Sequence, residues 1–133
     1  MTYDEAIPVL DEMKTRLEAR IKKILPGREV AAVCDAVKIS VLDESDSSAD
    51  YWHWCLDVNF GWDTGKMFKG EREFTCTINP FTCGSFDPTD RTDNKARYFV
   101  LVSEVIGHAF EIKTVLKEYF LKRESIRAQI DPE

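Results

Sequence analysis

At 133 residues the chain has the length of one domain, which can bury about two thirds of the surface that its unfolded form exposes without the help of disulfides. An apolar share of 44% and a charged share of 32% are typical of a soluble globular domain and disfavour both global disorder and a membrane protein. The net charge of -6 disfavours direct binding to nucleic acid or to an anionic membrane. We therefore expect a single domain over residues 1–133.

The first predicted element is a helix over about residues 2–25. Thr2 and Glu5 have the spacing of a capping box, and Pro26 with Gly27 ends the pattern. Apolar residues recur at helical spacing in Ile7, Leu10, Leu17, Ile21 and Ile24. Pro8 removes a backbone hydrogen bond beyond the first turn, so we expect a kink there or a later start of the helix.

Three strands are predicted after this helix. Apolar and polar residues alternate in the second half of the stretch 30–43, which predicts the first strand. The stretch 51–62 alternates strictly and is rich in aromatic residues, as expected for a strand with one buried face and one open face. Residues 61–66 predict a turn and residues 74–79 predict the third strand. The short connections favour an antiparallel meander.

A long helical segment is predicted from Asp93 onward. Its apolar stripe steps by three and four residues through Tyr98, Val102, Val105, Ala109, Ile112, Leu116, Tyr119, Arg123, Ile126 and Ile130. An unbroken helix over this stripe would be about 55 Å long, which exceeds the width of a domain of this size. Either the segment bends at Gly107 and its second half packs on the first helix, or a straight helix meets a partner subunit. The sequence thus predicts an α+β domain whose helices pack on one face of a three-stranded sheet.

The one local group of potential metal ligands lies in the aromatic strand. His53, Cys55 and Asp57 share the open face of that strand, and His108 in the long helical segment is the second histidine of the chain. Neighbouring side chains on one face of a strand lie roughly 7 Å apart, so three in a row do not converge on one ion. We expect no metal and no cofactor, and keep as an alternative a metal-dependent enzyme or metal sensor that uses these four residues.

The cysteines predict neither a zinc site nor a disulfide framework. Cys34, Cys55, Cys76 and Cys83 lack paired spacing. The acidic N-terminus is unlike a secretory signal, so we expect reduced thiols and a cytoplasmic protein without membrane association. Asp87, Asp90 and Asp93 follow Cys83 and would disfavour its thiolate, so no catalytic residue is assigned.

Charge and aromatic residues point instead to a protein partner. No basic residue occurs between Lys38 and Lys66, whereas acids gather there, which favours a basic protein partner or, as an alternative, mimicry of a nucleic acid. An uncovered C-terminal stripe would favour a homodimer. The predicted contact residues are Trp52, Trp62, Asp43, Glu44, Asp46, Asp50, Tyr119, Ile126 and Ile130. We expect a small acidic non-enzymatic interaction module, such as an adaptor, an inhibitor or an accessory protein of a mobile element.

Overall fold

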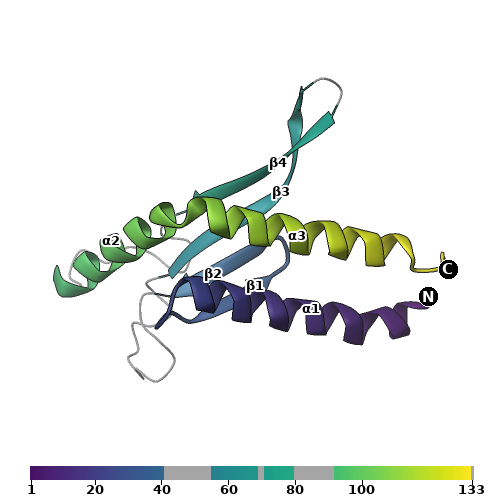
Figure 1. Ribbon diagram of the computed structural model, residues 1–133, viewed down its shortest axis with the longest axis horizontal. Coiled ribbons are helices and arrows are strands. Elements are labelled where there is room, and N and C mark those ends of the chain that lie inside the picture. Colours follow the sequence, from purple (N-terminus) through teal and green to yellow (C-terminus); the bar gives the residue numbers. More distant parts are fainter. Residues whose placement is uncertain (41–54, 69–70, 80–91, 133) are drawn as a thin grey trace.

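The computed structural model describes residues 1–40, 55–68, 71–79 and 92–132 (Figure 1). Its elements are α1 (Tyr3–Ile24), β1 (Val30–Val33), β2 (Ala36–Ser40), β3 (Cys55–Phe68), β4 (Glu71–Asn79), α2 (Thr92–Gly107) and α3 (Ala109–Ala128). The strands form one antiparallel sheet in the order β1-β2-β3-β4. The predicted α+β fold is confirmed. In the described part of the chain, no helix has the length and apolar character needed to cross a membrane.

The sheet has four strands where the sequence predicted three. The stretch predicted as a first strand is a hairpin, β1 and β2, with Val33 paired to Ala36 across the turn at Cys34 and Asp35. Cys34 has a positive φ of 53°, the conformation that a two-residue hairpin turn requires at its first position. This turn lacks the Asn-Gly or Asp-Gly signature, which is why the alternation resembles that of a single strand.

The predicted turn at residues 61–66 is also wrong, because β3 continues to Phe68. Its outer end pairs with β4 through Met67 with Arg72 and Phe68 with Glu71, after a register shift that follows Trp62. The β3–β4 hairpin consequently projects beyond the helices (Figure 1).

The N-terminal cap of α1 matches its prediction. The backbone N–H of Glu5 donates to Oγ1 of Thr2 over 3.1 Å, and the Thr2 hydroxyl donates to the Glu5 carboxylate over 3.1 Å. The helix begins at Tyr3, so the later start considered for Pro8 is wrong, and Pro8 lies exposed within the helix.

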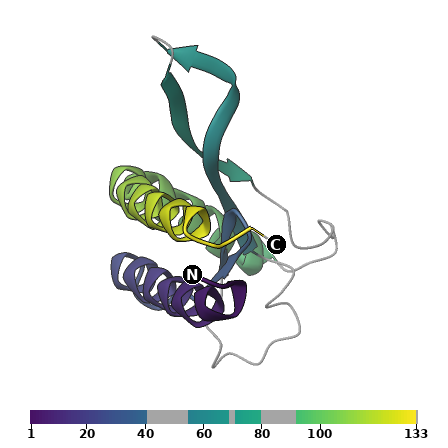
Figure 2. The same ribbon diagram turned by 90° about the vertical axis from the view of Figure 1, so that its right-hand side faces the viewer.

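Helices α1 and α3 lie side by side and antiparallel on one face of the sheet (Figure 2). The core between these layers includes Leu17, Ile21, Val37, Ile39, Leu56, Val58, Leu101, Val105, Leu116 and Phe120. The two ends of the chain meet, since the backbone N–H of Asp131 donates to the carbonyl of Met1 over 2.7 Å. The opposite face of the sheet presents polar residues such as Lys38, Asp57 and Thr77. They lie there because successive side chains of a strand point to opposite faces.

The long helical segment is interrupted at His108, one residue beyond the predicted bend at Gly107. Its second half, α3, packs along α1, so Leu116 and Phe120 of the C-terminal stripe are buried within the same chain. This is the arrangement that the sequence offered as the alternative to a straight helix. A partner subunit is not needed to cover those two residues.

Candidate functional site

The predicted metal ligands are not brought together within the described part of the chain. Cys55 and Asp57 belong to the open face of β3, whereas His108 lies at the junction of α2 and α3 on the other side of the sheet. The Nδ1 atom of His108 is 3.7 Å from the Glu111 carboxylate. No group of three potential ligands occurs among the described residues, and His53 lies outside them.

The cysteines differ from the prediction of four reduced thiols. Cys34 and Cys76 are free, but Cys55 is disulfide-bonded. Its side chain is buried although it lies on the open face of the strand. The expectation of a free thiol at Cys55 is therefore wrong. Cys83 lies outside the described residues.

Several of the predicted partner residues also lie outside the described residues, namely Trp52, Asp43, Glu44, Asp46 and Asp50. Trp62 is half-buried at the edge of the core, where its ring packs edge-on against Phe74 and Phe120. Its indole N–H donates to the carboxylate of Glu124 over 3.0 Å. Trp62 thus contributes to the fold of its own chain, with only part of its surface open to solvent.

The remaining predicted contacts, Tyr119, Ile126 and Ile130, are half-buried on α3 and the residues that follow it. The Tyr119 ring packs edge-on against Phe60 with ring centroids 6.0 Å apart. The exposed apolar surface of the helical segment lies elsewhere, on α2 and the first turn of α3.

Four large apolar side chains on that surface face solvent. Phe99 is 62% exposed, Val100 53%, Ile106 59% and Phe110 84%. Together with Ser103, residues 99, 106 and 110 step by four, three and four, which places them on one face of a helix. We call Phe99, Ser103, Ile106 and Phe110 the outer stripe. The outer stripe was not predicted from the sequence. It has the same spacing of three and four residues as the stripe through Tyr98 and Val105, and spacing alone does not tell which of the two stripes is buried.

The outer stripe stays on one face of the helical segment across the break at His108. Backbone hydrogen bonds from His108 to Glu104, 3.1 Å, and from Ile112 to His108, 3.0 Å, keep the helical spacing across the junction. A shallow hollow beside the stripe is lined by Phe99, Val100, Ser103, Glu104, Gly107 and His108. The small residues Ser103 and Gly107 leave room for the backbone of another helix to approach closely.

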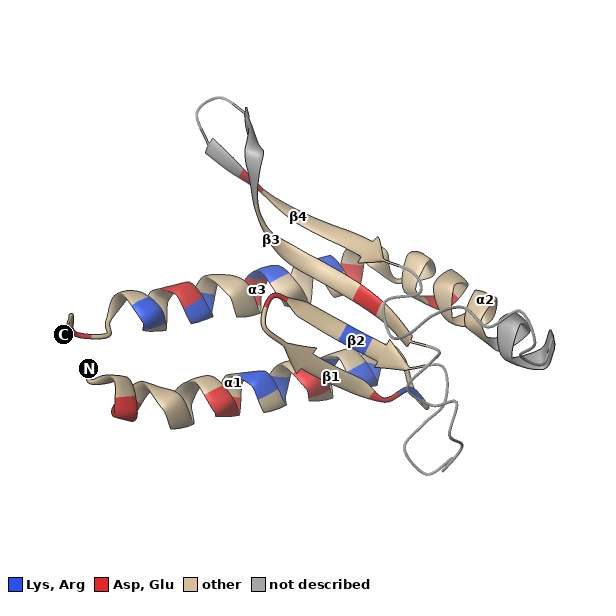
Figure 3. Cartoon of the chain, turned by 180° about the vertical axis from the view of Figure 1, so that it is seen from behind, with Lys and Arg blue, Asp and Glu red and all other residues tan. Residues whose placement is uncertain are grey.

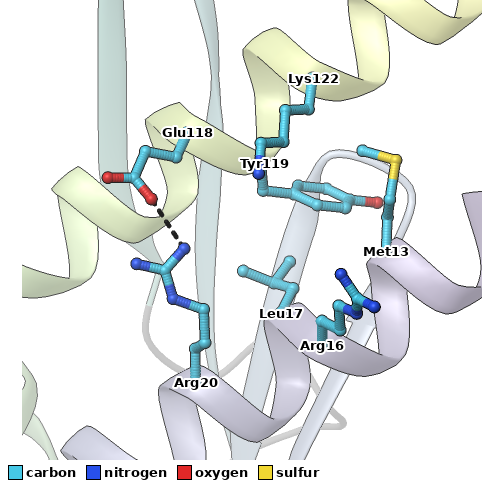
Figure 4. Close-up of a pocket in the computed structure, with 7 residues that line it drawn as sticks. All are labelled: Met13, Arg16, Leu17, Arg20, Glu118, Tyr119 and Lys122. Atoms are coloured by element: carbon cyan, nitrogen blue, oxygen red, sulfur yellow. Dashed lines mark hydrogen bonds and ion pairs between the residues drawn. The ribbon is translucent and has the colours of Figure 1, made fainter.

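A second feature is a groove of about 230 Å³ at the solvent side of the α1–α3 seam (Figure 4). It is lined by Met13, Arg16, Leu17 and Arg20 from α1 and by Glu118, Tyr119 and Lys122 from α3. Figure 4 shows the Tyr119 ring lying across the seam between Met13 and Leu17. Arg20 donates to Glu118 over 2.7 Å, and Arg16 pairs with Glu12 of its own helix over 2.6 Å.

Figure 3 shows charged residues concentrated on α1 and α3, and few on the parts of the strands that it colours. The groove is lined by three cations and one carboxylate, and Glu12 pairs with one of these cations, so an excess of one positive charge remains there although the whole chain carries a net charge of -6. Comparison of the chain with models of protein families, with curated proteins and with solved structures found no match. Its function therefore has to be inferred from these two surfaces.

Proposed function

We propose that the protein is a non-enzymatic protein-interaction module that forms a homodimer through the outer stripe of α2 and α3. The observation that carries this proposal is the exposure of Phe99, Ile106 and Phe110 on one helix face. A contiguous apolar surface on a soluble monomer promotes aggregation, and such surfaces commonly mark sites of protein contact. The Val100 side chain extends the same surface toward Gly107.

The spacing of the outer stripe favours a second copy as the partner. Steps of four, three and four residues read the same in both directions. Two antiparallel stripes related by a twofold axis therefore place Phe99 opposite Phe110 of the other copy and Ser103 opposite Ile106. Aromatic residues then meet aromatic residues, and a small residue meets a large one. This self-complementarity is the requirement for an isologous interface.

The available area supports a reversible dimer. With about 200 Å² for a fully exposed aromatic side chain, the exposed apolar side chains offer on the order of 400 Å² per copy, about half of a standard interface. Neighbouring polar residues have to supply the remainder. We therefore expect dissociation upon dilution rather than an obligate dimer.

Light scattering over a range of protein concentrations tests this proposal. The wild-type mass should rise from near 15.3 kDa toward twice that value as the concentration increases. Phe110→Glu should keep the protein monomeric at every concentration, because it places a charge within the apolar contact, opposite Phe99 of the other copy. Tyr3→Glu is the matched control, since Tyr3 is an exposed aromatic residue at the start of α1, at the opposite end of the molecule from α2, and its replacement should leave dimerisation unchanged (Figure 1). A wild-type protein that stays monomeric at high concentration would refute the dimer.

The disulfide bears on the location of this module. The sequence predicts a cytoplasmic protein, but disulfides persist mainly in oxidising compartments, and Cys55 is disulfide-bonded. We propose a cytoplasmic location, which requires that Cys55 is reduced in the cell. Alkylation of the protein during lysis of its native host, followed by peptide mass analysis, distinguishes the two cases: a labelled Cys55 supports the cytoplasm, and an unlabelled Cys55 supports an oxidising compartment.

A further inference from the structure

We propose that the groove between α1 and α3 binds an acidic, partly apolar segment of a protein partner. This site is distinct from the outer stripe and does not depend on dimerisation. It combines an apolar floor, formed by Met13 and Leu17 with the ring of Tyr119, with a rim of cations (Figure 4). Such a surface fits a ligand that carries an anionic group beside an apolar side chain.

The rim retains donors for an anion. Lys122 forms no ion pair within the described part of the chain, and its exposed ammonium group supplies three donors. Arg16 and Arg20 each engage one carboxylate through a single nitrogen, so further N–H groups of both guanidinium groups can donate. The Tyr119 hydroxyl likewise has no hydrogen bond to another described residue. A carboxylate would meet opposite charge from both helices.

The size of the groove decides between a small-molecule ligand and a peptide. Pockets for cofactors and drug-sized ligands enclose about 300 to 1,000 Å³, which is more than the groove offers. A volume of about 230 Å³ instead matches one or two side chains. The groove is also partly open to solvent, so one side chain of a polypeptide can enter it while the rest of the peptide lies outside. An acidic peptide segment is therefore the favoured ligand.

Titration of the isotope-labelled full chain with the dipeptide N-acetyl-leucyl-glutamic acid amide, followed by NMR, tests this inference. We expect saturable shifts in the amides of residues 13–20 and 118–122. The matched dipeptide with glutamine in place of glutamic acid should bind at least about fivefold more weakly, because it lacks the charge. Equal shifts with both dipeptides, or none at a dipeptide concentration in the tens of millimolar, would overturn the proposal.

Two charge reversals on α3 provide the control. Lys122→Glu should weaken binding of the acidic dipeptide by about tenfold, since it replaces a cation of the rim by an anion. Lys117→Glu makes the same change of net charge on an exposed residue outside the groove and should alter the affinity by less than about twofold, because solvent screens distant charges. An equal loss in both variants would show nonspecific attraction and contradict the site. The Phe110→Glu monomer should bind the dipeptide like the wild type, which separates this test from that of the dimer.

Discussion

Arg123 of α3 holds Asp35 of the β1–β2 turn, which lies 88 residues earlier in the chain. The guanidinium donates to the Asp35 carboxylate and, over 3.0 Å, to the carbonyl of Cys34. The Arg123 side chain is only 4% exposed and lies over the rings of Phe60, Tyr119 and Phe120 at 5.7, 5.5 and 5.2 Å from their centroids. One buried cation thus ties the hairpin turn, the centre of the sheet and α3 together.

This arrangement predicts unequal effects of removing the two partners. Asp35→Ala leaves the buried guanidinium without its counter-charge and should lower the free energy of unfolding by about 2–3 kcal/mol. Arg123→Met removes the buried charge, keeps apolar contact with the rings, and leaves Asp35 facing solvent, so it should cost less. Urea unfolding followed by circular dichroism measures both. An Asp35→Ala protein as stable as the wild type would contradict the role given to the pair.

The second prediction concerns the attachment of α2. Arg28 donates through Nε and a terminal nitrogen to both oxygens of Glu104, over 3.1 and 2.9 Å, and the Arg28 side chain is 13% exposed. This bidentate pair links the segment between α1 and β1 to α2. A double-mutant cycle with Arg28→Ala and Glu104→Ala should give a coupling free energy of about 1 kcal/mol, since the pair is only partly shielded from solvent. A coupling of zero would show that the pair does not hold the helix.

The third prediction concerns the thiols of Cys76 and Cys34, which are free. Burial raises the pKa of the Cys76 thiol, and the ammonium of Lys113 acts in the opposite direction. A raised pKa means that less thiolate is present at a given pH, so alkylation of Cys76 should be slow at pH 8 and should continue to accelerate above pH 9. Lys113→Met should slow it further, because the opposing charge is lost. Cys34 is exposed and should react faster at pH 8, where peptide mass analysis follows both residues.

Local patterns predicted most of the fold. The capping pair at Thr2, the alternation of β3 and the helical stripe after Tyr98 each depend on neighbours along the chain, and each is found in the structure. The turn at Cys34 was missed because its conformation is imposed by pairing and by the contact of Asp35 with Arg123, a residue far away in sequence. The periodicity places Arg123 in an apolar stripe, and only the packed structure shows which groups satisfy its charge.

The candidate surfaces were less predictable. Exposure of Phe99 and Phe110 depends on which face of the helical segment the sheet covers, and two apolar faces were present in the sequence. The groove requires α1 and α3 to lie antiparallel so that Arg16 and Lys122 meet across one seam. Periodicity within one element cannot give this pairing of two elements. The disulfide at Cys55 could not be predicted for the same reason, since spacing along the chain says little about proximity in the fold.

The most direct test of the proposed dimer introduces opposite charges at two positions that face each other across its twofold axis. Phe99→Lys and Phe110→Glu should each give a monomer. The double variant should dimerise again, because the lysine introduced at position 99 then faces the glutamate introduced at position 110 of the other copy. Both positions are exposed, so neither change should lower the stability of the monomer. Sedimentation equilibrium of the three variants measures this. A dimer regained only in the double variant is the predicted result, and a double variant as monomeric as either single variant would contradict the antiparallel pairing.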